Sequence, residues 1–349
     1  MGLDTFWFCL IAVLWSGYFV LEGFDFGVGM LQLFVPHNER ERGVLFRSVG
    51  PVWDGNEVWL VVAAAATFAA FPTWYATMFS GFYVALLAIL VLLIVRVVSF
   101  EWRERGDGDR WRRTWSVVHA GASLMIPFAW GVALASLLHG VPLASDGTFT
   151  GGVSDLISPY SIFAGATLAL LSLFHGATFL TLRLTGGLQS RLNDVCRALS
   201  WPAGGAGCAL AVWTLVEAID RNNKDAFPTL LPAALAVAAL ALAVASARKL
   251  RTGRAFLATA GGIVLLVATL FTGLYPRVLV SAPNLGNSLT LANSASAHYA
   301  LAVMTVAAVL LLPVVLIYQG WTYRVLRARL AGEEIDPGIV APQPPPEPG

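Results

Sequence analysis

The chain has 349 residues, of which 57% are hydrophobic and only 12% are charged, with a net charge of +1. The charged share is about half that of a soluble globular domain, and the mean hydropathy of +0.70 agrees. A soluble fold of this size cannot bury so much apolar surface, so we expect lipid to be the main solvent. No basic patch interleaves with aromatic residues, which argues against nucleic-acid binding.

Apolar runs long enough to cross a hydrocarbon core of about 30 Å follow one another along the chain. In lipid such runs must be helices, because every backbone polar group needs a partner within the segment. The sequence therefore predicts an all-α integral membrane protein, a bundle of nine transmembrane helices. Their approximate ranges are Phe6–Phe34, Val52–Phe71, Thr77–Phe100, Trp115–Leu138, Tyr160–Leu182, Leu199–Ile219, Phe227–Ala247, Phe256–Tyr275 and Ala297–Trp321.

Positive charges are distributed unevenly between the two sets of loops. Only Arg221, Lys224 and Arg277 lie on one side, and Arg96 lies inside the third run, whereas the remaining Lys and Arg residues lie on the other side. The positive-inside rule then places the N-terminus outside and the C-terminus in the cytoplasm of a bacterial inner membrane. The N-terminus lacks a signal-peptide pattern, so we expect the first run to be retained.

The domain organisation follows from the short loops. We expect residues 1–331 to form a single transmembrane domain. Residues 332–349 are acidic and then Pro-rich, which is typical of a disordered cytoplasmic tail.

Ionisable residues within a span are costly, so each one is a candidate functional residue. Glu22 and Asp25 lie three residues apart in the first run and therefore share a helix face. Asp25 is too deep for its short side chain to reach water, so it must be paired, protonated or beside internal water. A structural ion pair or a helix-packing hydrogen bond is the alternative to a functional role.

A second cluster of polar residues lies at the start of the second apolar run. Asp54 and Glu57, with Asn56 between them, are flanked by Trp53 and Trp59. Acids near a helix N-terminus interact favourably with the helix dipole, which offers a structural explanation for Asp54. The density of polar residues exceeds what capping needs, which favours a functional role for this turn.

Arg96 lies near the inner end of the third run. One interpretation is that its side chain snorkels to the cytoplasmic interface. The other pairs it with Asp25 or Asp54, where it would keep buried carboxylates ionised or leave one of them protonated to relay a proton.

The sequence predicts no metal site and no catalytic residue on this chain. The histidines show no i, i+4 pair of the kind that binds a metal on a helix, so we expect His119, His139 and His175 to be structural or interfacial. The three cysteines include no CxxC pair, which argues against a zinc site or a disulfide framework.

Five motifs in order along the chain together resemble subunit II of cytochrome bd-type quinol oxidases. They are GFDFGVGML, GPVWDGNEVWL, FSGFYVALL, LIVR with FEWR, and LTLANSASAHYALAVMTVAAVLLLPVVLIYQGW. Nine helices with an external N-terminus are also the topology of that family. The resemblance covers the whole length of the membrane domain.

The resemblance implies a role in aerobic respiration, as part of a complex that oxidises quinol at the outer side and reduces dioxygen to water. Subunit I, the heterodimer partner, would carry two haems b and one haem d, and this chain would ligate none of them. Protons would come from the cytoplasm, which generates proton-motive force. The family can also hold a structural quinone in subunit II and can bind small single-helix accessory subunits.

Residue by residue, Asp25, Asp54 and Arg96 match polar positions of the family. Asp54 and Trp53 match a proposed proton entry, with Glu22 and Glu57 as neighbours. The sequence departs from some relatives at Glu57, where they have Gln, at Val97, where they have Pro, and at His175, where they have Gln. These departures leave the role of Glu57 and the reach of Arg96 open.

Three other interpretations compete with this one. A secondary transporter would explain polar residues at membrane depth, but the acids cluster toward one side and no repeat is evident. A self-sufficient haem or quinone enzyme would need His or Met pairs at matched depth. A scaffold that only stabilises subunit I would make all the buried acids structural.

Overall fold

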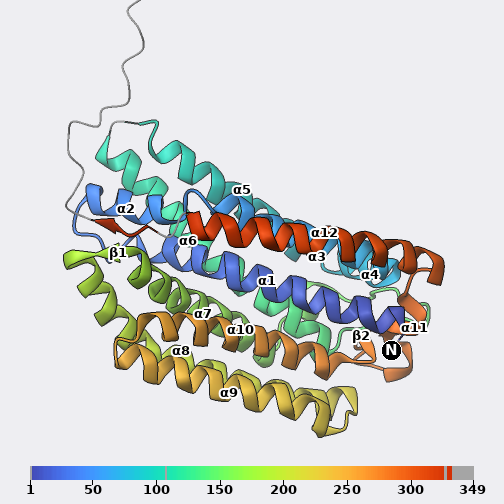
Figure 1. The fold of residues 1–349 in the computed structure, drawn as a ribbon. Coiled ribbons are helices and arrows are strands. Elements are labelled where there is room, and N and C mark those ends of the chain that lie inside the picture. Colours follow the sequence, from blue (N-terminus) through green and yellow to red (C-terminus); the bar gives the residue numbers. More distant parts are fainter. Residues whose placement is uncertain (1, 107, 326–327, 332–349) are drawn as a thin grey trace, which may run out of the picture.

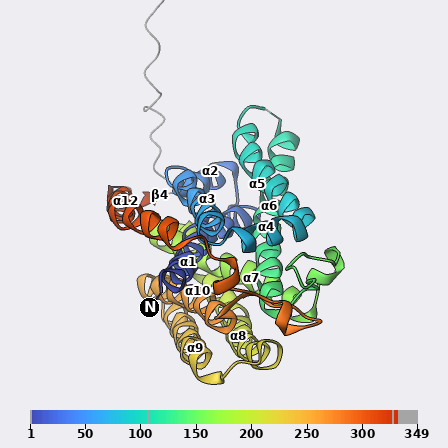
Figure 2. The same cartoon turned by 90° about the vertical axis from the view of Figure 1, so that its right-hand side faces the viewer.

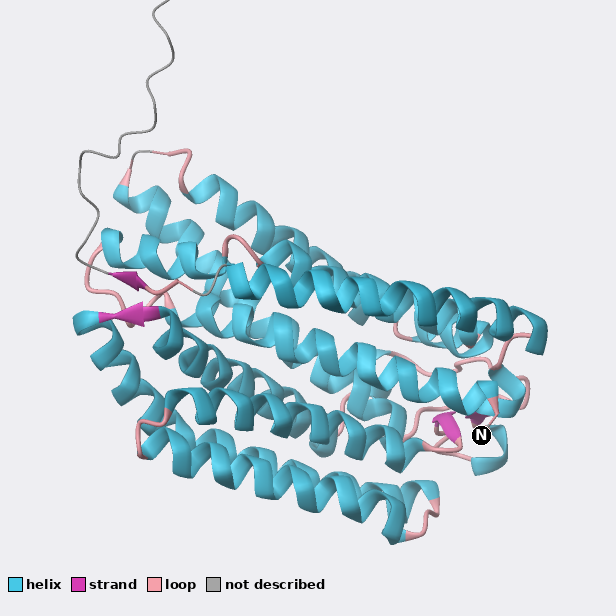
Figure 3. Ribbon diagram, in the orientation of Figure 1, coloured by secondary structure: helices cyan, strands magenta, loops and turns pink. Residues whose placement is uncertain are grey.

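A computed structural model describes residues 2–106, 108–325 and 328–331. The chain forms a bundle of long helices that run along a common direction (Figures 1 and 3). The helices are α1 Leu3–Leu31, α2 Glu39–Val49, α3 Trp53–Ala70, α4 Pro72–Gly81, α5 Tyr83–Arg103, α6 Asp109–His139, α7 Pro159–Arg183, α8 Gly186–Asn222, α9 Ala226–Arg248, α10 Thr252–Leu274, α11 Leu291–Ser294 and α12 His298–Val325, with short 3-10 turns η1 Val153–Leu156 and η2 Leu285–Asn287.

Two small sheets, each of two short strands, pair loop segments at opposite ends of the bundle (Figure 1). At one end β1 (Leu184–Thr185) pairs in parallel with β4 (Leu330–Ala331). At the other end β2 (Arg277–Leu279) pairs antiparallel with β3 (Leu289–Thr290), near the N-terminus. The end with β1, β4 and α2 carries most of the loop arginines, so we refer to it as the cytoplasmic end.

The predicted all-α membrane architecture is confirmed. In the described ranges, eight helices are long and apolar enough to span a membrane, and α3 with α4 counts as a ninth span if the bent pair is taken as one. The pair is bent by 120° at Phe71. Pro72 follows the bend, where it lacks the N–H needed to continue α3 but suits the first turn of a new helix.

Some predicted boundaries were wrong. The third run was predicted to begin at Thr77, but Thr77 belongs to α4, and α5 begins only at Tyr83. Arg191 and Arg197, expected in a loop, lie in the first turns of the 37-residue helix α8. The predicted tail at 332–349 lies outside the described residues.

The first helix is the centre of the bundle. It contacts α3, α6, α7 and α10, and Figure 2 shows it between α3 and α10. Its second half is almost continuously buried. Close approach to α7 depends on two glycines, because a Cβ on Gly27 would lie 2.7 Å from the Cα of Gly176.

The cytoplasmic end is held by ion pairs from α2. Glu39 pairs with Arg42 and with Arg103 of α5, and Glu41 pairs with Arg191 of α8. The Asn38 side chain caps the helix by accepting a hydrogen bond from the Glu41 N–H. These contacts fix α2 across the cytoplasmic ends of α5 and α8.

Candidate functional site

A buried ion pair lies at the centre of the cytoplasmic half. Arg96 on α5 pairs with Glu22 on α1, and the two residues are 4% and 0% exposed. The guanidinium also lies over the ring of Phe26, 4.8 Å from its centroid. Arg96 therefore turns into the bundle and does not snorkel. Its partner is Glu22, whereas the sequence argument predicted Asp25 or Asp54.

One turn further along α1, Asp25 contacts α3. The Asn56 side chain donates a hydrogen bond of 2.7 Å to one carboxylate oxygen of Asp25. The Asn56 carbonyl oxygen accepts from the Tyr323 hydroxyl at 2.7 Å and from the Gln319 amide at 3.3 Å, both on α12. A single amide thus links α1, α3 and α12 through Asp25.

Sequence reasoning missed Asn56, Gln319 and Tyr323 as members of the site. Asn56 was noted only for its part in the local density of polar residues. Gln319 is a polar residue in an otherwise apolar run and could have been singled out on that ground. Nothing in the sequence indicates that α12 packs against Asn56.

The other predicted residues surround this centre. Glu57 is half-buried on α3 and close enough to Arg96 for their charges to attract. Trp53 is also half-buried, and its ring lies 6.2 Å from that of Phe100. Asp54 is exposed in the first turn of α3. The structure therefore brings Glu22, Asp25, Glu57 and Arg96 together and leaves Asp54 at the edge.

Three buried polar atoms of the centre have no hydrogen-bond partner among the described residues: Glu22 Oε2, Asp25 Oδ1 and Arg96 Nε. A small cavity of about 20 Å³ is lined by two of these residues, Asp25 and Arg96. Its polar lining side chains are Asp25, Arg96 and His119. Phe46, Trp53 and Phe100 contribute aromatic walls. Unpaired polar atoms beside a cavity indicate internal water.

His175 is fully buried and engaged on both sides of its ring. One nitrogen lies 3.1 Å from the backbone oxygen of Val20 and the other lies 2.6 Å from the Thr259 hydroxyl. The ring stacks on Phe256 at 4.7 Å. These contacts join α1, α7 and α10 and engage both ring nitrogens. Within the described ranges, no group of three His, Cys, Asp or Glu side chains is arranged to hold a metal ion.

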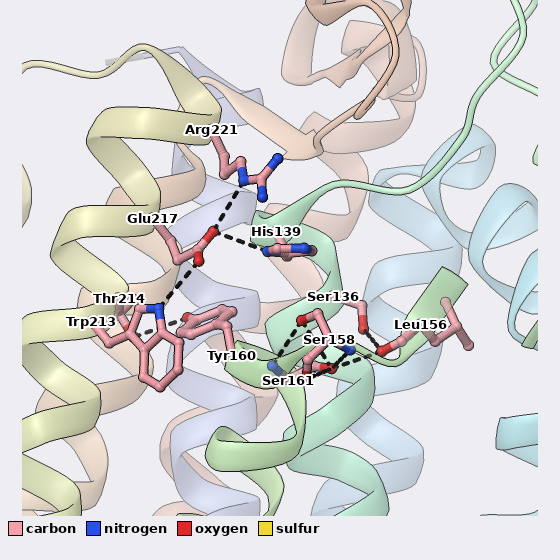
Figure 4. Close-up of polar contacts among 10 residues, drawn as sticks. All are labelled: Ser136, His139, Leu156, Ser158, Tyr160, Ser161, Trp213, Thr214, Glu217 and Arg221. Carbon is pink, nitrogen blue, oxygen red and sulfur yellow. Dashed lines mark hydrogen bonds and ion pairs between the residues drawn. The ribbon is translucent and has the colours of Figure 1, made fainter. Parts of the chain in front are cut away.

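A second polar cluster lies at the opposite end of the bundle (Figure 4). His139 of α6 lies 3.0 Å from Glu217 of α8, which also accepts a hydrogen bond from Trp213 and pairs with Arg221 at 3.6 Å. Below it, the Tyr160 hydroxyl of α7 lies 2.9 Å from that of Thr214. The cluster joins α6, α7 and α8 at this end of the bundle.

Comparison with known proteins decides the family. Residues 3–326 match the family described as cytochrome bd terminal oxidase subunit II. The chain belongs to this family. It is 42% identical to the cytochrome bd ubiquinol oxidase subunit 2 of Bacillus subtilis (strain 168), over 95% of this chain and 98% of that one.

Two further similarities agree with the family membership. The chain is 33% identical to the cytochrome bd-I ubiquinol oxidase subunit 2 of Escherichia coli (strain K12), over 96% of this chain and 97% of that one. A chain from the bd oxidase of Geobacillus thermodenitrificans has the same fold, with a TM-score of 0.70 and 19% identity over 93% of this chain and 98% of that chain.

Membership in the bd oxidase family makes the chain a multi-pass inner-membrane subunit of a quinol:oxygen oxidoreductase complex. The transporter and the self-sufficient enzyme are therefore excluded as its main function. The scaffold interpretation concerns only the buried acids, and it competes with the proposal below.

Proposed function

We propose that this chain pairs with the haem-bearing subunit I of a cytochrome bd quinol oxidase and supplies part of its cytoplasmic proton path. The observation that carries the second part is a polar network in which Arg96 pairs with Glu22 and lies close enough to Asp25 and Glu57 for their charges to act on it. The three carboxylates come from adjacent faces of α1 and α3.

Charge balance supports a proton-carrying role for this network. One guanidinium neutralises one carboxylate, and the buried oxygens of Glu22 and Asp25 are cut off from bulk water. Two fully buried ionised carboxylates, Glu22 and Asp25, beside one Arg in a low dielectric are strongly unfavourable. At least one proton is therefore held within the network, and the carboxylates offer it several positions to occupy.

The network also has an outward connection. Asp54 is exposed in the first turn of α3, Glu57 is half-buried one turn further in, and Asp25 and Glu22 are fully buried on α1. This order gives a graded series of carboxylates from the surface to the interior. Such a series suits proton uptake, whereas a purely structural site needs only the Glu22–Arg96 pair.

We infer the face that contacts subunit I from the exposure of apolar side chains on two spans. The apolar stretch of α12 is only 6% buried and that of α5 is 22% buried, the lowest values among the eight helices that are long and apolar enough to span a membrane singly in the described ranges. A groove of about 590 Å³ lies between α3, α4 and α5 and is lined by residues such as Val61, Ala65 and Leu90. We place subunit I against this face.

In the proposed complex, subunit I holds two haems b and haem d, oxidises quinol at the outer side, and reduces dioxygen to water. Charge separation generates proton-motive force because the chemical protons are drawn from the cytoplasm. A structural quinone in this chain and small single-helix accessory subunits belong to the same family-based proposal.

The Asp25→Asn variant of the purified complex tests the proton path. The new amide keeps the size of the side chain and still accepts a hydrogen bond from Asn56, but it does not titrate. We expect oxygen reduction to slow by about 10²-fold, the lower range for a positioned proton carrier. The reduced-minus-oxidised haem spectrum should be unchanged. Turnover at the parent rate in a fully assembled complex would favour the scaffold interpretation.

Asp54→Asn gives a second measurement at the exposed end of the series. We expect slower oxygen uptake with an intact haem spectrum, and a smaller effect than at Asp25, because water can reach the position around Asp54. Asp194→Asn on α8 is the matched control, since it makes the same change at an exposed carboxylate outside the series. An Asp54 variant that behaves like the Asp194 variant would remove Asp54 from the path.

A further inference from the structure

We infer that the cavity beside Asp25 binds one water molecule and that His119 is the residue that positions it. The inference extends the proposed proton path, on which its role in turnover depends, but the water site itself follows from geometry alone. Sequence analysis treated His119 as structural or interfacial.

The orientation of the His119 ring is fixed by three neighbours. Its Nδ1 lies 3.1 Å from the backbone oxygen of Arg96. A carbonyl oxygen only accepts, so Nδ1 must carry the proton and donate it. The rings of Phe46 and Phe100 pack around the imidazole at 5.3 and 6.2 Å. In the neutral ring the remaining nitrogen, Nε2, is therefore an acceptor with a fixed direction.

That nitrogen points toward α1 at a position without a side chain. A Cβ built on Gly29 would lie 3.0 Å from His119 Nε2. Gly29 is one helical turn from Asp25, so both lie on the same face of α1. Ser123 Oγ of α6 fills the place that a Gly29 Cβ would take, so the glycine lets α6 approach α1 closely. The imidazole and the Asp25 carboxylate both line the cavity beside this contact.

The cavity has the size and the partners that one water molecule needs. Its volume of about 20 Å³ exceeds the roughly 10–15 Å³ that a single water requires. The unpaired Asp25 Oδ1 and Arg96 Nε belong to lining residues. A water donating to Asp25 Oδ1 and His119 Nε2 and accepting from the Arg96 Nε–H would satisfy all three groups.

The bound water places an exchangeable proton between a carboxylate and an imidazole. The aromatic side chains of Phe46, Trp53 and Phe100 also line the cavity. The charged groups that act on His119 are Arg96 and Arg103 of α5, with Asp25 facing it across the cavity. His119 is thus a positioning residue: it holds the water that would hand a proton to Asp25.

The test compares the purified parent complex with His119→Phe and His119→Gln. We expect a high-resolution cryo-electron microscopy map of the parent to contain density for one water between Asp25 and residue 119. The Gln carbonyl can replace Nε2 as an acceptor, so the Gln variant should keep the water, whereas the Phe variant should lose it. Absence of the water from the parent map would overturn the inference, even if the Phe variant fails to assemble.

Turnover provides the second readout. We expect oxygen reduction by His119→Phe to slow by about tenfold, with the loss growing as the pH rises and protons become scarce, and His119→Gln to restore the parent profile. A Phe variant with the parent pH profile would contradict the positioning role. Failure of the proposed proton path looks different: Asp25→Asn would then turn over at the parent rate while the water remained in the map.

Discussion

At the scale of single residues, the Glu22–Arg96 ion pair is buried on both sides, unlike the other Asp/Glu–Arg pairs among the described residues. Both charges are buried, so each depends on the other to offset its lost hydration. We expect Arg96→Leu to destabilise the chain by about 3–5 kcal/mol, because it leaves the Glu22 charge uncompensated. The measurement is the yield of assembled complex from membranes.

A double variant separates charge imbalance from loss of packing. In Glu22→Leu with Arg96→Leu, no uncompensated charge of the pair remains, so assembly should recover well above the level of Arg96→Leu alone. If the double variant assembles no better than the single one, the pair is held for its shape and its hydrogen bonds, and not for charge compensation.

The sequence could predict which residues of this site are unusual but not all of their partners. Glu22, Asp25 and Arg96 stand out because ionisable residues are rare in apolar runs. Which carboxylate meets Arg96 depends on the rotation of α1 against α5, and a difference of one helical turn decides between Glu22 and Asp25. Tyr323 reaches Asn56 only because α12 packs beside α3, a contact between residues 267 positions apart.

At the scale of elements, the crossing of α1 and α7 depends on glycine. A Cβ on Gly176 would lie 2.6 Å from the Cα of Gly27, so the helices must separate to admit it. We expect Gly176→Ala to cost about 1–3 kcal/mol and to lower the thermal midpoint of the purified complex.

The matched control for that change is Gly205→Ala on α8, where a Cβ meets nothing within 4 Å. Its expected effect is neutral or slightly stabilising, because Ala is the better helix former. Equal effects at the two positions would show that the crossing tolerates a methyl group and that both substitutions act only through helix propensity.

The attachment of α2 to α8 should depend on pH. Burial acts to raise the pKa of Glu41, but hydrogen bonds from the Arg191 side chain and from the His37 N–H outweigh it and lower the pKa. The stabilisation is therefore complete above the unfolded-state pKa of about 4.3 and is lost as the pH falls through the lower folded-state pKa.

Arg191→Gln measures this contribution. We expect a loss of about 0.2–1 kcal/mol at neutral pH, typical of a partly exposed pair, seen as a lower thermal midpoint. The difference from the parent should shrink as the pH falls below the Glu41 pKa. Arg197→Gln, which removes a more exposed pair with Asp194 at 3.7 Å, should show no such pH dependence.

The element boundaries show where sequence reasoning ends. Apolar length located every span, since the lipid core imposes it. It could not show that Pro72 turns the chain by 120° into α4 and delays α5 to Tyr83. It also could not show that α8 continues beyond the membrane, because charged residues such as Arg191 and Arg197 suit an exposed helix as well as a loop.

At the scale of the whole molecule, the apolar surface is the feature that connects the fold to the complex. Lipid and a partner subunit both cover apolar side chains, so exposure alone does not separate them. The groove between α3, α4 and α5 adjoins α5, one of the least buried spans, and its concave apolar surface of about 590 Å³ offers close packing to the side chains of another protein. A second apolar hollow of about 540 Å³ lies between α8 and α9, so α9 serves as the comparison surface.

Filling the groove should therefore weaken the complex. Ala65 is exposed and lines the groove, and Trp at this position would occupy space that we assign to subunit I. We expect the overpacking to weaken association by roughly tenfold or more, measured as haem retained per tagged chain after purification in mild detergent.

Ala238→Trp on the exposed face of α9 adds the same side chain away from the groove and should retain the parent amount of haem. Equal haem retention by the two variants would place subunit I on another face, whereas loss from both would indicate that Trp disturbs insertion of the chain.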